Sequence, residues 1–283
     1  MGEFTNKIDF EVLVMVKNAN PNGDPLNGNR PRETYDGYGE ISDVCIKRKI
    51  RNRLQDMGEN IFVQSDERSD DGAKSLADRA KNNAVMQKAL KDKDKEAYAK
   101  EACQTWIDVR SFGQVFAFKD DSVSVGVRGP VSIHSAFSVL PISIDSMQIT
   151  KSVNSETVKE GKKSSDTMGM KHKVYSALYV LKGSINHQLA QKTGFSDDDA
   201  EKIKEALRTL FVNDASSARP DGSMEVCKLY WWKHNCPMGQ YSSAKVHKLL
   251  VIEAKGDDPK EFDDYTITLN ALPGLDAEVI EGI

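Results

Sequence analysis

The chain has 283 residues, of which 39% are hydrophobic and 29% are charged, and its formal net charge at pH 7 is -4. This composition supports a folded core in one large domain or about two ordinary ones. No stretch approaches the roughly 18 apolar residues of a membrane-spanning helix, and residues 1–6 lack the basic and apolar regions of a secretory signal. We therefore expect a cytoplasmic protein with no membrane partner.

The cysteines are scattered and form no C-x-x-C pair. They are Cys45, Cys103, Cys227 and Cys236. This spacing argues against a disulfide framework or a zinc site and favours reduced thiols. We expect neither a metal nor a cofactor.

Residues 8–18, IDFEVLVMVKN, combine alternation with a continuous apolar run and predict a well-buried strand. The segment that follows is dense in asparagine, glycine and proline, and residues 16–32 read VKNANPNGDPLNGNRPR. A reversal of chain direction needs fewer turn residues than this. Asparagine side chains and glycine N–H groups can bond phosphate or sugar oxygens, so this loop is a candidate cradle for a nucleic-acid backbone.

Residues 42–58 predict an amphipathic helix, with Ser42 as the N-cap and Gly58 at the C-terminal stop. Its apolar stripe consists of Ile46, Ile50, Leu54 and Met57. The opposite side is basic and is expected to face solvent; it contains Lys47, Arg48 and Arg51. Five basic residues within seven repel one another unless an anion lies nearby, so this side is either a solvated surface or a phosphate-binding one.

The middle of the chain alternates between polar and strand-like segments. Residues 59–105 are polar, rich in lysine, aspartate and alanine, and helical in tendency, which indicates an insertion on a core domain. Residues 109–118 and 122–133 are strand-like and predict a hairpin. Residues 144–173 hold few large apolar side chains, and a segment of this kind inside a compact domain indicates a functional or flexible excursion.

The last part predicts a buried strand at 174–185 and a helix at 196–211, in which Ser196 and Asp199 form a capping-box pattern. The side chains of this helix expected to face inward are Ala200, Ile203, Leu207 and Leu210. Further strand candidates are 224–234 and 244–255.

With the insertions removed, the order of elements approximates the βαββαβ unit of ferredoxin-like and RRM folds. We therefore predict an α+β fold built around an RRM-like sheet. Such a sheet is a common RNA platform, although a fold does not dictate a function.

Three short motifs each have a functional and a structural interpretation. In VGVRGPV, Arg128 lies between Gly126 and Gly129, which is typical either of a strand end or of a close approach to a ligand. The methionines of TMGMKHKV (167–174) are either core residues or an exposed wedge between bases. The aromatic triplet at 230–232 either packs in a core or stacks on bases.

Catalytic motifs are weak in this sequence. The histidines are dispersed, without an HExxH pattern: His134, His172, His187, His234 and His247. His172, beside Lys171, is the one local candidate for the general base of a nuclease.

Five motifs carry a family resemblance. In chain order they are NPNGDPLNGNRPR, DVCIKRKIRNRL, DVRSFGQVFAF, VRGPVSIHSAF and TMGMKHKV. Together they resemble the backbone subunit of type I-C CRISPR Cascade complexes, the Csd-type member of the Cas-seven superfamily. The resemblance covers about residues 10 to 180, and its first two motifs are the most specific.

The resemblance implies a protein shaped like a right hand. Its RRM-like palm would comprise residues 1–58, 106–143 and 174–283. Residues 59–105 would form helical fingers, and residues 144–173 an extended thumb hairpin. Copies of such a subunit assemble head to tail along one CRISPR RNA, and each thumb kinks the guide of its neighbour.

The function that the resemblance implies is RNA binding without catalysis. The partners would be the guide RNA, target DNA that pairs with the guide, other copies of the chain and other Cascade subunits. The implied RNA contacts are Asn18, Asn20, Asn22, Lys47, Arg48, Arg51, Arg128, Lys151, Met168, Met170, Lys171 and His172. An RNA endonuclease that processes precursor RNA and an assembly protein whose basic helix meets an acidic partner remain alternatives.

Overall fold

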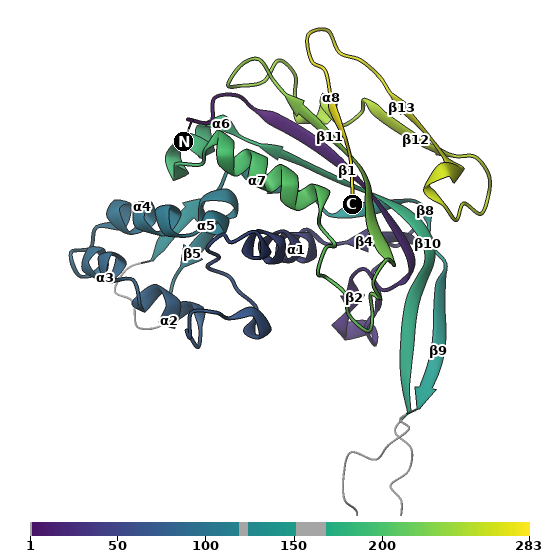
Figure 1. Cartoon of the computed structure of the whole chain (residues 1–283), viewed down its shortest axis with the longest axis horizontal. Coiled ribbons are helices and arrows are strands. Elements are labelled where there is room, and N and C mark those ends of the chain that lie inside the picture. The colour runs from purple at the N-terminus through teal and green to yellow at the C-terminus, as the bar shows by residue number, and fades with distance from the viewer. Residues whose placement is uncertain (1, 119–123, 151–167) are drawn as a thin grey trace, which may run out of the picture.

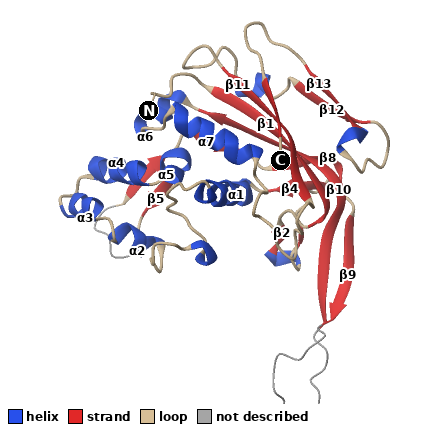
Figure 2. Cartoon of the chain, in the orientation of Figure 1, coloured by secondary structure: helices blue, strands red, loops and turns tan. Residues whose placement is uncertain are grey.

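The computed structural model describes residues 2–118, 124–150 and 168–283. Its strands form one large sheet with smaller ones beside it, and most of its helices gather on one side (Figure 1, Figure 2). The strands are β1 (Ile8–Ala19), β2 (Gly23–Asp24), β3 (Arg30–Pro31), β4 (Tyr38–Ile41), β5 (Gly113–Phe116), β6 (Val125–Arg128), β7 (Val131–Ile133), β8 (Ala136–Pro141), β9 (Ile144–Thr150), β10 (Met168–Ile185), β11 (Met224–Lys233), β12 (Leu250–Ala254), β13 (Tyr265–Leu269) and β14 (Glu278–Glu281). The α-helices are α1 (Asp43–Asp56), α2 (Leu76–Lys81), α3 (Ala84–Lys91), α4 (Lys95–Thr105), α5 (Ile107–Phe112), α6 (His187–Thr193), α7 (Asp197–Arg208) and α8 (Ser243–Val246).

The large sheet is antiparallel, with the strand order β14-β11-β1-β10-β8-β4, and β7 and β9 also pair with β10. Its central strand is β1, in which Val12 lies opposite Leu181 of β10 and Leu229 of β11. Both faces of β1 are covered by protein, which explains its continuous apolar run. The predicted strands at 8–18 and 224–234 are confirmed, and the mixture of helices with an antiparallel sheet agrees with the expected α+β class.

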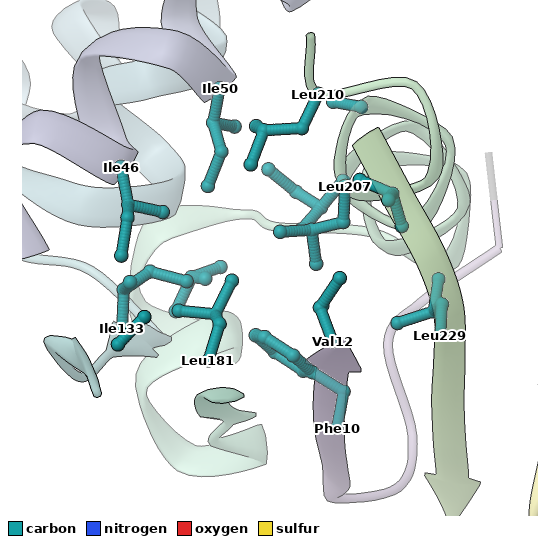
Figure 3. Packing of buried hydrophobic residues seen from close by; sticks show 14 of the residues in the cluster. Phe10, Val12, Ile46, Ile50, Ile133, Leu181, Leu207, Leu210 and Leu229 are labelled. Carbon is teal, nitrogen blue, oxygen red and sulfur yellow. The ribbon is translucent and has the colours of Figure 1, made fainter. Parts of the chain in front are cut away.

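One face of the sheet packs against α1 and α7 (Figure 3). Val12 of β1, Ile50 of α1 and Leu207 of α7 are all 0% exposed in this core. Burying an aliphatic side chain of this size contributes roughly 1.5 to 3 kcal/mol. These contacts fix both helices on the same side of the sheet, and therefore fix where their polar residues lie.

Both helices begin where the sequence predicts. The side chain of Ser42 accepts a hydrogen bond from the N–H of Cys45 at 3.3 Å, and Gly58 has a left-handed φ of 87° just beyond the end of α1. Ser196 and Asp199 form the predicted capping box of α7. An N-cap of this kind contributes about 1 kcal/mol.

The opposite face of the sheet is covered by α8 and by the β12–β13 pair. Tyr230 and Trp232 of β11 point into this second core and are 4% and 1% exposed, whereas Trp231 stacks on Phe10 in the first core. All three rings of the aromatic triplet are therefore core residues. The alternative in which they stack on bases is wrong for this conformation.

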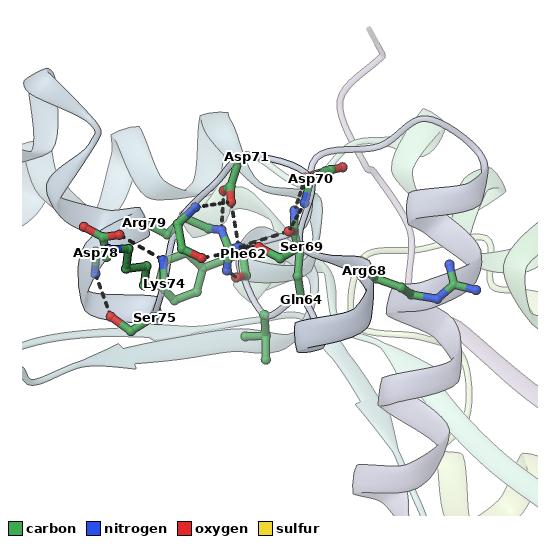
Figure 4. Close-up of polar contacts among 12 residues, drawn as sticks. Phe62, Gln64, Arg68, Ser69, Asp70, Asp71, Lys74, Ser75, Asp78 and Arg79 are labelled. Atoms are coloured by element: carbon green, nitrogen blue, oxygen red, sulfur yellow. Dashed lines mark hydrogen bonds and ion pairs between the residues drawn. The ribbon is translucent and has the colours of Figure 1, made fainter.

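The helices of the segment 59–105 share a separate hydrophobic cluster that includes Phe62, Tyr98 and Trp106. Arg79 of α2 is 6% exposed, and its hydrogen bonds hold the start of this segment in place (Figure 4). Its guanidinium donates to the carbonyl oxygen of Phe62 at 2.8 Å and pairs with the carboxylate of Asp71. The hydrogen bond from Arg79 lowers the pKa of Asp71 to about 2.

Two predicted strands are partly helical. Residues 109–112 belong to α5. Ile107 packs in the first core and Val109 packs in the cluster of the insertion, and a helix presents side chains to both at once. The predicted hairpin is correspondingly shorter, between β5 and β6. The candidate strand at 244–255 begins only at Leu250, since Val246 and Leu249 enter the second core at helical spacing.

The excursion at 144–173 is a pair of strands where the structure describes it. β9 pairs with the first residues of β10, from Thr150 opposite Met168 to Ile144 opposite Val174. This hairpin projects beyond the rest of the molecule (Figure 1). The predicted strand at 174–185 is confirmed and is longer than expected, because β10 is continuous from Met168 to Ile185.

Across the described ranges, no helix combines the length and apolarity needed to cross a membrane.

Candidate nucleic-acid interface

The asparagine-rich loop is held by its own side chains. The amide of Asn20 donates to the carbonyl oxygen of Asn29 at 2.7 Å, and Asn20 is 5% exposed. The side-chain oxygen of Asn22 accepts from the N–H and the hydroxyl of Ser42 at 2.9 and 2.8 Å, so it joins the loop to the start of α1. Of the three predicted asparagines, only Asn18 is exposed.

The loop and the projecting hairpin meet at the base of the hairpin. Arg30 donates to the hydroxyl of Ser146 at 3.0 Å, and that hydroxyl lies 2.8 Å from Nδ1 of His172. Lys173 donates to the side-chain oxygen of Asn18 at 2.9 Å. Two segments far apart in the sequence therefore form one polar surface, with the predicted Asn18 and His172 both on it.

The hairpin exposes apolar side chains on both faces. Successive residues of a strand point to opposite faces, so Met168, Met170 and His172 share one face, while Lys171 shares the other with Met147 and Ile149. Met168 and Met170 are 65% and 54% exposed, and Met147 and Ile149 are 43% and 47% exposed. The alternative in which the two predicted methionines are core residues is therefore wrong.

The basic side of α1 does not face solvent as expected. Lys47 pairs with Asp43 at 2.9 Å, Arg48 donates to the carbonyl oxygen of Val63 at 2.6 Å, and Nε of Arg51 lies 2.9 Å from Asp108. The neighbouring Lys49 is 4% exposed and pairs with Asp214.

The anions that relieve the mutual repulsion of these residues are therefore carboxylates of the same chain. The expectation of an open basic surface is wrong for Arg48 and Arg51, which tertiary contacts cover, whereas Lys47 pairs within its own helix and stays partly exposed. Burial lowers the pKa of Arg48, as is expected for a guanidinium withdrawn from water. Whether Lys47, Arg48 or Arg51 also contacts RNA stays a prediction.

Arg128 lies elsewhere. It is exposed at the end of β6 and lies opposite Gly113 of β5. In Figure 1, β5 lies on the other side of the molecule from β9. Arg128 lines a hollow of 760 Å³ together with Lys100 and Lys192. A Cβ atom on Gly129 would lie 2.3 Å from the carbonyl oxygen of Ser111, so this glycine serves close packing within the chain.

Two further candidates are Lys151 and His172. Lys151 lies outside the described residues. Among the residues that the structure describes, no group of three or more histidine, cysteine, aspartate or glutamate side chains could hold a metal ion. The hydrogen-bond partner of His172 is the hydroxyl of Ser146, which does not by itself make the imidazole a general base.

The motifs did not single out Arg30 or the exposed side chains of the same loop region. Leu26 and Tyr35 are fully exposed, at 98% and 104%. The pair of arginines around Pro31 was the available signal, because cations beside a turn-rich loop are typical of phosphate-binding surfaces.

Comparisons with known proteins agree on one family. The family model described as CRISPR-associated protein Cas7 matches residues 6–270. A CRISPR-associated protein Cas7 of Haloferax volcanii is 26% identical over 276 residues, which cover 90% of this chain and 77% of that protein.

Two solved structures are similar at low identity. A chain of a "CRISPR RNA-guided surveillance complex, pre-nicking" has a TM-score of 0.47 and 16% identity, with 80% of this chain and 75% of that chain covered. A chain of a "CRISPR RNA-guided surveillance complex" has a TM-score of 0.45 and 15% identity, with 80% and 68% covered. The family match spans most of the sequence, including the loop, α1 and the β9–β10 hairpin. The chain belongs to the Cas7 family of CRISPR-associated proteins.

Proposed function

We propose that this protein is a non-catalytic RNA-binding subunit that assembles head to tail along a CRISPR guide RNA. In the complex that results, guide bases pair with target DNA while the protein holds the guide backbone. The observation that carries this proposal is the β9–β10 hairpin, which projects from the body with methionine and isoleucine exposed on both faces. An isolated two-stranded hairpin is marginally stable in water, so these faces need a partner.

The partner chemistry follows from the residues around those apolar side chains. Lys171 has no carboxylate of the described chain within ion-pair distance, and Arg30 is bonded to a neutral hydroxyl. Cations beside exposed apolar groups suit a nucleic acid, because phosphates take the charge and unstacked bases take the apolar contact. The proposed wedge is Met168 or Met170, and the proposed backbone contacts nearby are Asn18, Lys171 and His172.

We further propose that the large sheet is an RRM-like palm and that the protein is of the Csd type found in type I-C systems. The order β11-β1-β10-β8, with α1 and α7 on one face, supports the palm, since the βαββαβ unit has this arrangement. Residues 59–105 are the proposed fingers and residues 144–173 the proposed thumb. The five motifs of the sequence support the subtype.

The test is guide binding by the purified protein. We expect RNA-dependent oligomers in sedimentation, and an affinity that falls with salt as phosphate contacts release counterions. Lys171→Glu is expected to weaken binding of every guide sequence. It should also reduce the steepness with which the logarithm of the binding constant falls with the logarithm of the salt concentration, by about one or more. Lys88→Glu, an exposed charge reversal on α3, is the matched control.

A monomer that binds no RNA at low salt would contradict the proposal. Loss of binding restricted to certain guide sequences would contradict contact through the backbone. Site-specific cleavage of precursor RNA, abolished by His172→Ala, would show instead that the protein is an endonuclease.

A further inference from the structure

A pocket of 410 Å³ lies on the face of the sheet that packs against β12. Its walls include the apolar side chains of Val139, Val180, Leu250 and Ile252. Phe137 is 43% exposed and also lines the pocket, so the hollow is open to solvent. Its size is that of pockets that hold small ligands or single side chains. None of its lining residues belongs to the loop or hairpin surface of the proposed RNA site.

One acidic group in this pocket has no hydrogen-bond partner. Glu11 projects from the central strand β1, its side chain is 1% exposed, and both carboxylate oxygens lack a donor in the described part of the chain. The ammonium of Lys182 is 3.8 Å away, beyond hydrogen-bond distance, and donates to the carbonyl oxygen of His247 instead. Ionising a buried carboxyl group that has no donors costs free energy, so a ligand that brings donors into the pocket would stabilise the ionised form of Glu11.

We propose that this pocket binds a guanidinium group on an aliphatic stem, whose N–H groups both oxygens of Glu11 accept. A guanidinium offers parallel donors in a fork that fits a carboxylate, and an ammonium does not. The apolar walls match the stem, which packs against such surfaces while its charged head is bonded. The ammonium of Lys182 also lines the pocket and repels a cationic ligand. The two hydrogen bonds to Glu11 must therefore outweigh this repulsion.

The charged and titratable groups around Glu11 set the pH dependence. They are Asp9 on the same strand, Lys182 on β10, Tyr230 opposite on β11, His247 after α8 and His134 after β7. From β12, only the apolar Leu250 and Ile252 line the pocket. Burial raises the pKa of Glu11 to about 8, outweighing the attraction of Lys182.

The ligand binds the ionised carboxylate. A pKa of about 8 leaves about a tenth of the molecules ionised at pH 7 and about nine-tenths at pH 9. The apparent affinity is reduced by the fraction of competent protein, so it should tighten about tenfold between these pH values. Binding at pH 7 should also release a proton into the buffer.

The experiment is an NMR titration that follows the methyl groups of Val139 and Val180. The probe is N-acetylarginine methylamide, and N-acetylcitrulline methylamide is the matched control, with nearly the same shape but no charge. We expect saturable shifts with the arginine probe, at least tenfold weaker binding of the citrulline probe, and tightening from pH 7 to pH 9. Glu11→Gln should abolish binding, whereas Glu253→Gln, which alters an exposed carboxylate on β12, should leave it unchanged.

Three results would overturn the proposal. Both probes could bind equally, the Glu11→Gln variant could still bind the arginine probe, or guanosine monophosphate alone could bind in a Glu11-dependent way. If Glu11→Gln fails to fold, Ile252→Phe, which fills the pocket and keeps Glu11, should abolish binding. Sedimentation then identifies the source of the group. Dissociation of the RNA-assembled oligomers by the arginine probe indicates an arginine of another copy, and unchanged mass indicates a free ligand. The NMR titration uses no RNA, so the site and the proposed function fail independently.

Discussion

Replacing Arg51 by alanine separates a role in the fold from a role in RNA binding. Nε of Arg51 lies 2.9 Å from Oδ2 of Asp108, whose carboxylate also accepts the N–H groups of Phe62 at 2.7 Å and Val63 at 3.1 Å. Asp108 is 1% exposed, so the substitution leaves a buried carboxylate without its cation. Breaking a buried pair in this way costs about 3 to 5 kcal/mol.

We expect the lower end of that range, about 3 kcal/mol, because Asp108 keeps two backbone donors. This is a large share of the 5 to 15 kcal/mol by which folded proteins are usually stable. For a chain of this size it corresponds to a melting temperature lower by roughly 5 °C. Contact with RNA alone would leave the stability of the free protein unchanged.

The assay is urea unfolding followed by tryptophan fluorescence, without RNA. Lys47→Ala is the matched control, because the Lys47–Asp43 pair lies one turn apart on the same helix and both side chains are partly exposed, at 26% and 38%. That pair contributes only about 0.3 to 0.5 kcal/mol. Arg51→Ala with unchanged stability, weaker RNA binding and a smaller salt slope would refute the structural role of Arg51.

Two further predictions concern the hairpin and the insertion. Met168→Ser with Met170→Ser should change stability by less than about 0.5 kcal/mol, since both side chains are exposed, yet reduce assembly with guide RNA in sedimentation. Met238→Ser, also exposed, is the control, and normal assembly of the double variant would exclude a methionine wedge. Asp71→Asn should lower stability at pH 7, modestly because Asp71 is partly exposed. The pKa of Asp71 in the folded protein is lowered to about 2, so the difference in stability from the wild type should persist above pH 4 and shrink as the pH falls from 3.8 through 2. Urea unfolding at several pH values measures this difference. Two stabilities that do not converge at low pH would contradict the prediction.

The elements that local patterns specify were predictable. The apolar run of 8–18, the N-cap Ser42 and the capping box of Ser196 and Asp199 all have their causes within a few residues of the chain. The residue pattern alone did not indicate strand pairing within the excursion, because a hairpin exposed on both faces lacks the apolar alternation by which strands are recognised. Only the family resemblance implied a hairpin there. The strand-like reading of residues 109–112 failed because two separate cores share that short helix.

The candidate site was predictable in its residue types and less so in its membership. The sequence indicated a turn-rich loop, cations and methionines, and the family resemblance joined them. Tertiary structure decided that Asn18, Arg30 and His172 share a surface, and that Arg128 lies on another part of the molecule.

What the sequence by itself determined were the helix limits, the buried central strand and the chemistry of the exposed motifs, because these depend on neighbours along the chain. The tertiary structure alone decided which charges are free. Arg51 and Lys49 look like solvent-facing cations until Asp108 and Asp214 approach from distant parts of the chain. The predicted strand that contains Glu11 was expected to be buried, but only the tertiary structure shows that β12 covers this face of the sheet and that no donor among the described residues reaches the Glu11 carboxyl group. Whether a charged side chain has an ion-pair or hydrogen-bond partner depends on long-range contacts, and these contacts cannot be predicted from local periodicity.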